Sequence, residues 1–251
     1  VHTLVIDEFD KCLEMGFQEE MSEVIVQIPY LKRRFLLSAT DAPAIPRFVS
    51  EGDFLKLNFL EDEEQIPERI KVYTVKSPEK DKLEVLSKLL CYLGDKSSLV
   101  FVNYRESVER VYRYLLQAGI SCEMFHGGME QKDRERALYK FSNGSCNVFV
   151  STDLAARGLD IPNIDHVIHY HLPLNEDAYI HRNGRTARWD ASGNVFLILG
   201  PEEYLPEFIQ QIPEDYVWEG PKPDPAKPQW VTLYIGKGKK DKINKVDIVG
   251  F

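Results

Sequence analysis

Two sets of charged side chains have the types and spacing that nucleotide chemistry requires. The first is the acidic run DEFD, in which Asp7, Glu8 and Asp10 follow the strand-like segment VHTLVI. In open α/β sheets, ligands bind beyond the carboxyl ends of strands, where a carboxylate can hold a magnesium ion on a nucleotide. Asp7 is the candidate for holding that metal through water, and Glu8 the candidate for positioning or deprotonating an attacking water. The alternative is an acidic helix N-terminus, which the helix dipole favours.

The second set is basic and lies in YIHRNGRTARWDASG, where Arg182, Arg185 and Arg188 recur at three-residue spacing beside His181. If Gly184 and the residues after it begin a helical turn, Arg185 and Arg188 share a face and can reach one phosphate group. Guanidinium groups at a γ-phosphate stabilise the charge of phosphoryl transfer. The alternative is an exposed basic face that is paired with nearby acidic side chains.

A third segment, VSTDLAARGLDIP, joins the end of a strand to a helix. Gly158 lets the backbone turn tightly there. Asp160 could accept hydrogen bonds from ribose hydroxyls, and Thr152 with nearby amides could hold an RNA phosphate. The alternative is a strand-to-helix turn that is capped by Thr152 or Asp153.

Two further patterns are ambiguous on their own. The tripeptide SAT, with Ser38 and Thr40, ends a strand, and small hydroxyl residues of this kind commonly cap helices. The cluster HVIHYH resembles a metal site, but on a strand only His169 and His171 share a face, and no acidic or cysteine partner stands at ligand spacing. We therefore expect these histidines to be structural.

The elements that position these residues alternate between strands and helices, which predicts an α/β fold with a parallel sheet. Residues 1–60 contain the strand-like segments VHTLVID, RRFLLSA and FLKLNF and a helical stretch over residues 11–28. An acidic linker is predicted at residues 61–67, and residues 68–212 are long enough for a complete α/β domain. Their strand-like segments are ERIKVYTV, SLVFVN, ISCEMFH, NVFVST, HVIHY and NVFLIL. The first block would leave an edge and an apolar face uncovered, so residues 1–60 are expected to be the later half of a first domain whose earlier half is absent.

The C-terminal end has two parts. Residues 213–229 are rich in proline and predict a semi-rigid linker. Residues 230–251 are expected to begin a further unit, with a strand, a basic glycine-bearing turn and a helix start, and to stop before that unit closes.

Composition narrows the functional classes. The chain has 251 residues, 43% hydrophobic residues, a net charge of −9 and a pI near 5.3, which argues against a protein that coats nucleic acid through its overall charge. Four scattered cysteines suggest neither a disulfide framework nor a zinc site, and a reducing cytoplasm fits best. No apolar run reaches the roughly 20 residues of a membrane span, and the opening segment reads as a strand and not as a signal peptide. We expect no membrane association and favour a monomer.

The order of the motifs resembles that of the DEAD-box RNA helicases. The matching segments, spread over about 180 residues, are DEFD, SAT, FVN, QKDR, STDLAARGLD and HRNGRTAR. The resemblance implies two RecA-like domains, here one complete and one partial, that clamp ATP and Mg²⁺ between them and hold single-stranded RNA across both.

The resemblance also implies residue roles. Asp7 and Glu8 would serve magnesium and water, and Asp10 would belong to the same catalytic motif. Gly158 and Asp160 would meet the nucleotide, and Arg185 and Arg188 would act as arginine fingers. Ser38 and Thr40 would couple the nucleotide state to the grip on RNA, and His181 would help bridge the ATP site to these coupling residues. The RNA side would hold Asn103, Gln131, Arg134 and Thr152.

The sequence also departs from the family pattern. Phe9 replaces the alanine of the motif that names the family, which bears on packing more than on chemistry. The sequence contains no GxxxxGK[ST] phosphate loop and no adenine-reading glutamine segment, so the chain as given is expected neither to bind ATP tightly nor to hydrolyse it. The C-terminal TLYIGKGKKDKINKVDIVGF resembles the opening of the small domain with which DbpA-type members recognise a ribosomal RNA hairpin; a solvated lysine-rich turn is the alternative.

The main hypothesis is therefore an RNA-stimulated ATPase that unwinds RNA locally, with a possible place in ribosome assembly. A non-catalytic RNA-binding or scaffold protein is the first alternative, which the missing phosphate loop favours and the acidic and arginine motifs oppose. A DNA helicase of the wider superfamily is the second. Stimulation by RNA and by DNA would separate them, because the 2′-hydroxyl is what distinguishes the two nucleic acids.

Overall fold

The chain forms two compact units. The computed structural model describes residues 1–38, 45–49, 54–58, 70–156, 164–186 and 192–250. The first unit comprises Val1–Gln65 and the second unit Ile66–Phe251. This division falls inside the acidic segment at residues 61–67 in which the sequence predicts a linker.

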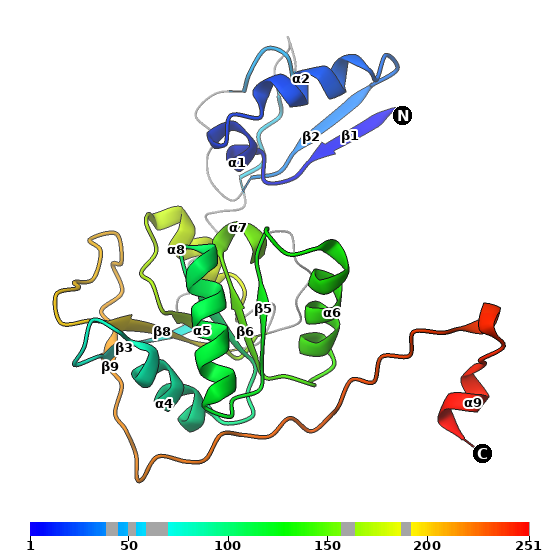
Figure 1. Ribbon diagram of the computed structural model, residues 1–251. Helices are drawn as coiled ribbons and strands as arrows, with labels where there is room; N and C mark the ends of the chain where they lie inside the picture. Colours follow the sequence, from blue (N-terminus) through cyan, green and yellow to red (C-terminus); the bar gives the residue numbers. More distant parts are fainter. Residues whose placement is uncertain (39–44, 50–53, 59–69, 157–163, 187–191, 251) are drawn as a thin grey trace. The chain divides into compact units, whose positions relative to one another are not determined.

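Within the described residues, the first unit contains a two-stranded parallel sheet and the helices α1 and α2 (Figure 1). Its elements are β1 (Thr3–Ile6), α1 (Phe9–Glu14), α2 (Gln18–Val26) and β2 (Arg33–Leu36). The prediction of one helix over residues 11–28 is wrong, because Gly16 has a φ of 79° and ends α1 in the left-handed region. The predicted strand FLKLNF is also wrong for residues 54–58, which are described and pair with no strand.

Phe9 is the centre of the small core of the first unit. It is 1% exposed and clusters with buried Ile25 and Val49. The side chain that departs from the family pattern is therefore accommodated by packing. By contrast, Val5 and Phe35, which are partners in the β1–β2 register, are both exposed. The uncovered apolar face expected from the sequence is thus present in this unit.

The second unit is built on a seven-stranded parallel sheet, which confirms the predicted α/β, RecA-like fold class (Figure 1). The strands are β3 (Ile70–Lys76), β4 (Ser98–Phe101), β5 (Cys122–Phe125), β6 (Val148–Ser151), β7 (His166–His169), β8 (Gly193–Leu199) and β9 (Glu214–Asp215). The helices are α4 (Leu83–Leu93), α5 (Arg105–Gln117), α6 (Gln131–Ser142), α7 (Asp153–Ala156), α8 (Glu176–Asn183) and α9 (Lys245–Val249). The order across the sheet is β5-β6-β4-β7-β8-β3-β9.

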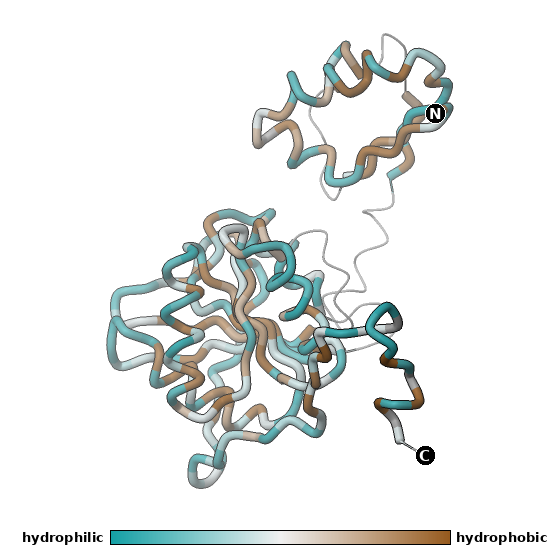
Figure 2. Tube along the Cα trace, turned by 45° about the vertical axis from the view of Figure 1, so that its right-hand side comes forward, coloured by the Kyte–Doolittle hydropathy of each residue, from teal (hydrophilic) through white to brown (hydrophobic). Residues whose placement is uncertain are grey.

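Helices cover both faces of this sheet. All four residues of each of the central strands β4, β6 and β7 are buried, as expected for parallel strands that are covered on both sides. In β4, Val100 packs in one core with α4 and α5, whereas Leu99 and Phe101 pack in the other with α6 and α7. Figure 2 shows this apolar centre as brown segments among more hydrophilic helices.

The proline-rich stretch packs along the second unit. Its first residues form β9, and the Tyr216 amide donates to the Thr74 carbonyl at 2.8 Å. The Trp218 ring then lies 5.2 Å from the Tyr92 ring. Further along, Thr232 hydrogen-bonds to Asn143 at 2.8 Å.

The strand predicted at the start of residues 230–251 is wrong, because that segment is extended but pairs with no strand among the described residues. A short 3₁₀ turn over Lys239–Asp241 and the helix α9 follow it.

Candidate nucleotide and RNA site

The acidic run stands at the carboxyl end of β1. Glu8 has a φ of 50°, a left-handed conformation that costs a residue with a side chain roughly 1–2 kcal/mol. Its amide donates to Asp7 Oδ1 at 2.9 Å, and the Asp7 carboxylate is exposed while Asp10 is buried. Strained non-glycine residues gather at functional sites, so this geometry supports a functional turn.

Ser38 lies at the same edge of the first unit. The Phe9 amide donates to the Leu37 carbonyl at 2.9 Å, and the Leu37 amide donates to the Ile6 carbonyl at 2.9 Å. The chain after β2 therefore runs beside the chain after β1, which brings exposed Ser38 next to the acidic run. Thr40 lies outside the described residues.

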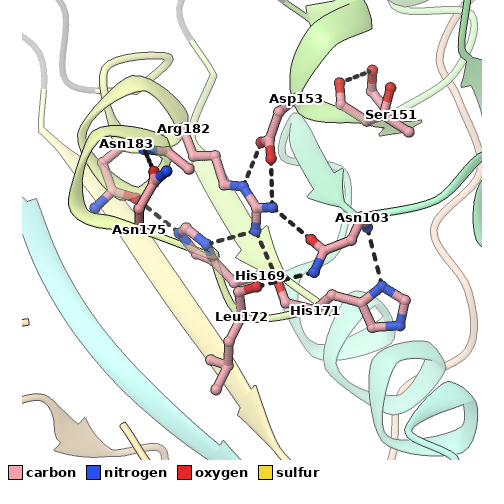
Figure 3. Close-up of polar contacts among 11 residues, drawn as sticks. Asn103, Ser151, Asp153, His169, His171, Leu172, Asn175, Arg182 and Asn183 are labelled. Carbon is pink, nitrogen blue, oxygen red and sulfur yellow. Dashed lines mark hydrogen bonds and ion pairs between the residues drawn. The ribbon is translucent and has the colours of Figure 1, made fainter. Parts of the chain in front are cut away.

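In the second unit, a polar network joins the ends of three neighbouring strands (Figure 3). Its centre is Arg182 of α8, which is 1% exposed. Arg182 Nε and Nη2 donate to the two Asp153 carboxylate oxygens at 2.5 and 2.8 Å. Nη2 also donates to Asn103 Oδ1 at 2.8 Å. Nη1 donates to the His171 carbonyl at 2.7 Å and to His169 Nδ1 at 3.3 Å.

The network fixes the tautomers of two histidines. His169 Nδ1 accepts from Arg182, so its proton lies on Nε2 and donates to Asn183 Oδ1 at 2.9 Å. His171 Nδ1 accepts from the Asn103 amide at 3.1 Å, so it too is neutral. Burial, with the positive charge of Arg182 as a second cause, lowers the pKa of His169 to about 3. Burial and then Lys82 lower the pKa of His171 to about 4. Both histidines therefore have a structural role, as the sequence predicts.

Asn103 and Thr152, expected on the RNA side, lie on two of these strand ends. Both polar atoms of the Asn103 side chain are engaged, because Nδ2 donates to the Leu172 carbonyl at 3.3 Å. Thr152 is half-buried, and its carbonyl accepts the Ala156 amide at 3.0 Å, which begins α7. Gly158 and Asp160 lie outside the described residues.

His181 and Arg185 come from the end of α8. The helix starts where Asn175 Oδ1 accepts the Ala178 amide at 2.8 Å, and it ends at Asn183. The predicted helical turn from Gly184 is wrong for the described residues, because Thr186 forms a β-bridge with Ile164. Arg185, in the intervening turn, is 8% exposed.

Arg185 and His181 line a small pocket at the carboxyl edge of the sheet. The other lining residues are Phe101, Asp153, Ala156, Ala178 and Arg182. Arg185 therefore lines, from a buried position, a cavity of about 10 Å³, which has room for about one water molecule. A phosphate could reach Arg185 only if this cavity widened. Arg188 lies outside the described residues, so a pairing of the two arginines on one phosphate stays a prediction.

Gln131 and Arg134 lie in the first turn of α6. Arg134 Nη1 donates to Gln131 Oε1 at 3.4 Å, which fits their three-residue spacing. Gln131 also donates to Glu135 Oε1 at 3.0 Å and is exposed, while the Arg134 guanidinium lies 4.9 Å from the centre of the Phe125 ring. These side chains are available to a ligand that approaches α6.

Sequence reasoning missed the central role of Arg182. Arg182 belongs to the series of arginines at three-residue spacing, but its acceptors lie up to 79 residues away in the sequence. They stand at the ends of strands whose order in the sheet cannot be read from the sequence. Among the described residues, no group of three or more His, Cys, Asp or Glu side chains could hold a metal ion. No helix in the described ranges has the length and apolar character that crossing a membrane demands.

The chain is similar to one family model and to several known proteins. Residues 81–190 match the model of the helicase conserved C-terminal domain. The chain is 33% identical over 258 residues to the ATP-dependent RNA helicase DbpA of Escherichia coli, covering 100% of this chain and 56% of that protein. Its fold is similar to S. cerevisiae Dbp5 bound to RNA and ADP BeF3, with a TM-score of 0.69, 28% identity, and coverage of 80% of this chain and 54% of Dbp5.

The E. coli DEAD-box protein SrmB, solved bound to regulator of ribonuclease activity A, is 32% identical with a TM-score of 0.54, covering 64% of this chain and 98% of that one. The chain spans about half the length of the curated relatives it matches, 56% in the case of DbpA. These findings confirm the resemblance inferred from the order of the motifs. The chain belongs to the DEAD-box RNA helicase family and carries the helicase C-terminal domain of that family.

Proposed function

We propose that this protein is an ATP-dependent RNA helicase, in which RNA-stimulated ATP hydrolysis drives local unwinding of RNA duplexes. The observation that carries the proposal is the placement of His181 and Arg185 around one pocket at the carboxyl edge of the second-unit sheet. Ligands of open α/β sheets bind at that edge. A protein that only bound RNA would need neither this arginine nor the acidic run at Asp7 and Glu8.

Each motif has a part in the proposed reaction. Asp7, exposed at the strand end, has the oxygen donors that a magnesium ion prefers, and it would hold the ion through water. Bound there, the ion would neutralise charge on the phosphate oxygens. Glu8 would orient the attacking water and accept its proton, and Asp10 would support the acidic turn from its buried position.

Arg185 and Arg188 would complete the nucleotide site. Arg185 and Arg188 would stabilise the negative charge that develops on the transferred phosphoryl group, and His181 would link them to the coupling residues Ser38 and Thr40. Gly158 would form the tight turn of the nucleotide-binding segment, and Asp160 would meet the ribose. ATP is thus the proposed substrate.

RNA is the proposed partner. Gln131 and Arg134, on an accessible turn of α6, would contact its backbone together with Thr152 and the loop that carries Asn103. We also propose ribosomal RNA as the target, a monomeric state and a cytoplasmic location. The four cysteines, which all lie among the described residues, are free thiols, as a reducing compartment favours.

The test is ATP hydrolysis by the full-length protein with an RNA oligonucleotide, with DNA of the same sequence, and with neither. The proposal expects turnover that rises with RNA and not with DNA. Equal stimulation by DNA would indicate a DNA helicase. Tight RNA binding without hydrolysis would indicate a non-catalytic RNA-binding protein. Either result would overturn the proposal.

A further inference from the structure

Arg182 lies between the strand ends that are proposed to contact RNA and the end of α8 that is proposed to contact the nucleotide. It directly follows His181 in α8 and precedes Arg185 by three residues. Its guanidinium binds the chain just after β6, at Asp153, and just after β4, at Asn103. It also binds the end of β7, and β6, β4 and β7 are adjacent in the sheet. One side chain therefore joins three neighbouring strand ends to one helix.

All five guanidinium N–H groups of Arg182 are engaged within the second unit. Asp153 accepts two hydrogen bonds, Asn103 one, and His169 and His171 one each. A guanidinium has five donors in a fixed planar arrangement, so its acceptors are held at fixed angles to one another. Arg182 is thereby committed to the protein itself, and its role differs from that proposed for Arg185.

We propose that Arg182 is a positioning residue that holds the RNA-side loops in register with the arginine end of α8, so that RNA binding controls ATP turnover. This inference rests on the proposed function. Thr152 directly precedes Asp153, and Asn103 lies on the loop after β4, so RNA contacts at either loop reach Arg182 through one or two hydrogen bonds. Because the guanidinium is buried and all its donors are engaged, a shift of either loop would break these hydrogen bonds or displace the end of α8 that carries His181 and Arg185.

His171 connects Asn103 to Arg182 by a second route. His171 accepts the Asn103 amide through Nδ1, and its own carbonyl accepts from Arg182. Asn103 is therefore fixed both by its side chain and by its backbone. A displacement of the loop after β4 would therefore cost hydrogen bonds to Arg182 and to His171, which couples the position of this loop to that of Arg182.

The central test replaces Arg182 by lysine in the full-length protein. Arg182→Lys keeps the charge but offers one nitrogen with three donors, which cannot reach acceptors on three strand ends. The matched control is Arg113→Lys on α5, whose arginine is 69% exposed and pairs with Glu109. The measurement is the ratio of kcat at saturating RNA to kcat without RNA, at a temperature where circular dichroism shows each variant folded.

The expected result is a fall of the stimulation ratio by about tenfold or more for Arg182→Lys, equivalent to about 1.4 kcal/mol of lost coupling. Arg113→Lys should leave the ratio unchanged. A residue that merely stabilises the fold would lower the melting temperature and leave the ratio of the folded molecules intact. A folded Arg182→Lys protein with the wild-type ratio would therefore overturn the inference.

A second variant covers the case in which Arg182→Lys does not fold. Asn103→Ala removes one acceptor and leaves the pair of Arg182 and Asp153 intact. If Asn103 only touched RNA, the variant would raise the KM for RNA and keep the wild-type kcat at saturation. The inference expects kcat at saturating RNA to fall, and a change confined to KM would contradict it.

A separate readout distinguishes failure of this inference from failure of the proposed function. If the wild-type protein shows no RNA-stimulated hydrolysis, the proposed function is wrong, and the coupling falls with it. If stimulation is present and survives in both variants, only the inference is wrong.

Hydrogen exchange of the 251-residue chain tests the loop directly. The backbone amide of Asn103 should exchange with solvent about tenfold faster in Arg182→Lys, and unchanged exchange would show that Arg182 does not hold this loop.

Discussion

Asp153 and Arg182 form two parallel hydrogen bonds, 2.5 and 2.8 Å long, between residues that are 29 positions apart in the sequence. The pair joins the start of α7 to the end of α8, and the arginine is 1% exposed while the aspartate is 27% exposed. A bidentate pair of this kind gives both energy and geometric specificity. It links the loop after β6 to α8.

Removing the carboxylate should destabilise the second unit. Asp153→Ala leaves the buried charge of Arg182 without its counter-ion, which should lower the free energy of unfolding by about 3 kcal/mol. The matched control is Asp133→Ala on α6, because Asp133 makes an exposed ion pair with Arg136 at 3.6 Å. That variant should lose less than about 1 kcal/mol. Urea denaturation at neutral pH measures both losses of unfolding free energy. Equal losses would show that the buried pair stabilises the protein no more than the exposed pair does.

The neutral histidines of the network predict a pH-dependent stability. The folded-state pKa values, about 3 for His169 and about 4 for His171, lie below the unfolded value of about 6.5. As the pH falls from about 6.5 to 4, the unfolded chain binds protons that the folded chain does not, so the free energy of unfolding falls. Each histidine contributes a slope of up to about 1.4 kcal/mol per pH unit, and the stability is fully present above pH 7.

Urea denaturation between pH 7.5 and pH 5 tests this expectation. His171→Asn should remove the part of the slope that comes from His171 and leave the part that comes from His169, whatever it does to the stability at neutral pH. A stability that stays constant over this interval in the wild-type protein would contradict the assignment of neutral Nε2–H histidines.

Much of this organisation was predictable, because it depends on local pattern. The apolar run SLVFVN predicts a buried strand and is found as β4, and the alternation of strands and helices predicts the parallel sheet. The motif order is sufficient to identify the family. Each of these features can be recognised from short stretches of consecutive residues.

What the sequence did not predict depends on distant partners. The helix expected over residues 11–28 is divided at Gly16, whose positive φ becomes visible only in the folded backbone. The segment at residues 54–58 has apolar residues of the kind that alternate in strands but pairs with no strand in the described part of the chain. The role of Arg182 requires acceptors from three strand ends, and their order across the sheet differs from their order along the chain.

The acidic run carries a prediction about catalysis. Glu8→Gln keeps the size of the side chain but removes the carboxylate that would accept a proton from the attacking water, so kcat should fall by about 10²-fold or more. Nucleotide binding by the full-length protein should persist, because the contacts to the phosphates remain. Glu19→Gln, at an exposed position of α2, is the matched control and should behave like the wild type. Steady-state turnover with RNA measures the effect, and an active Glu8→Gln protein would exclude Glu8 from the water-activating role.

The packing of the proline-rich stretch predicts that it stabilises the second unit. Trp218 contacts the rings of Tyr92 and Tyr216, and Lys88 Nζ lies 4.2 Å from the centre of its ring. Trp218→Ala should therefore lower the free energy of unfolding by about 2 kcal/mol. Trp230→Ala, which removes a tryptophan that is 66% exposed, should cost clearly less. If both substitutions are neutral, the stretch is only a tether.

The most direct test of the central claim is the ATP turnover of the full-length Arg185→Gln protein at saturating RNA. Arg185 lines the pocket at the carboxyl edge of the sheet, and glutamine keeps a polar side chain there without the charge and the guanidinium. If Arg185 stabilises the transferred phosphoryl group, kcat should fall by about 10³-fold or more, with RNA binding preserved and the fold intact by circular dichroism. A folded Arg185→Gln protein with wild-type turnover would contradict the account.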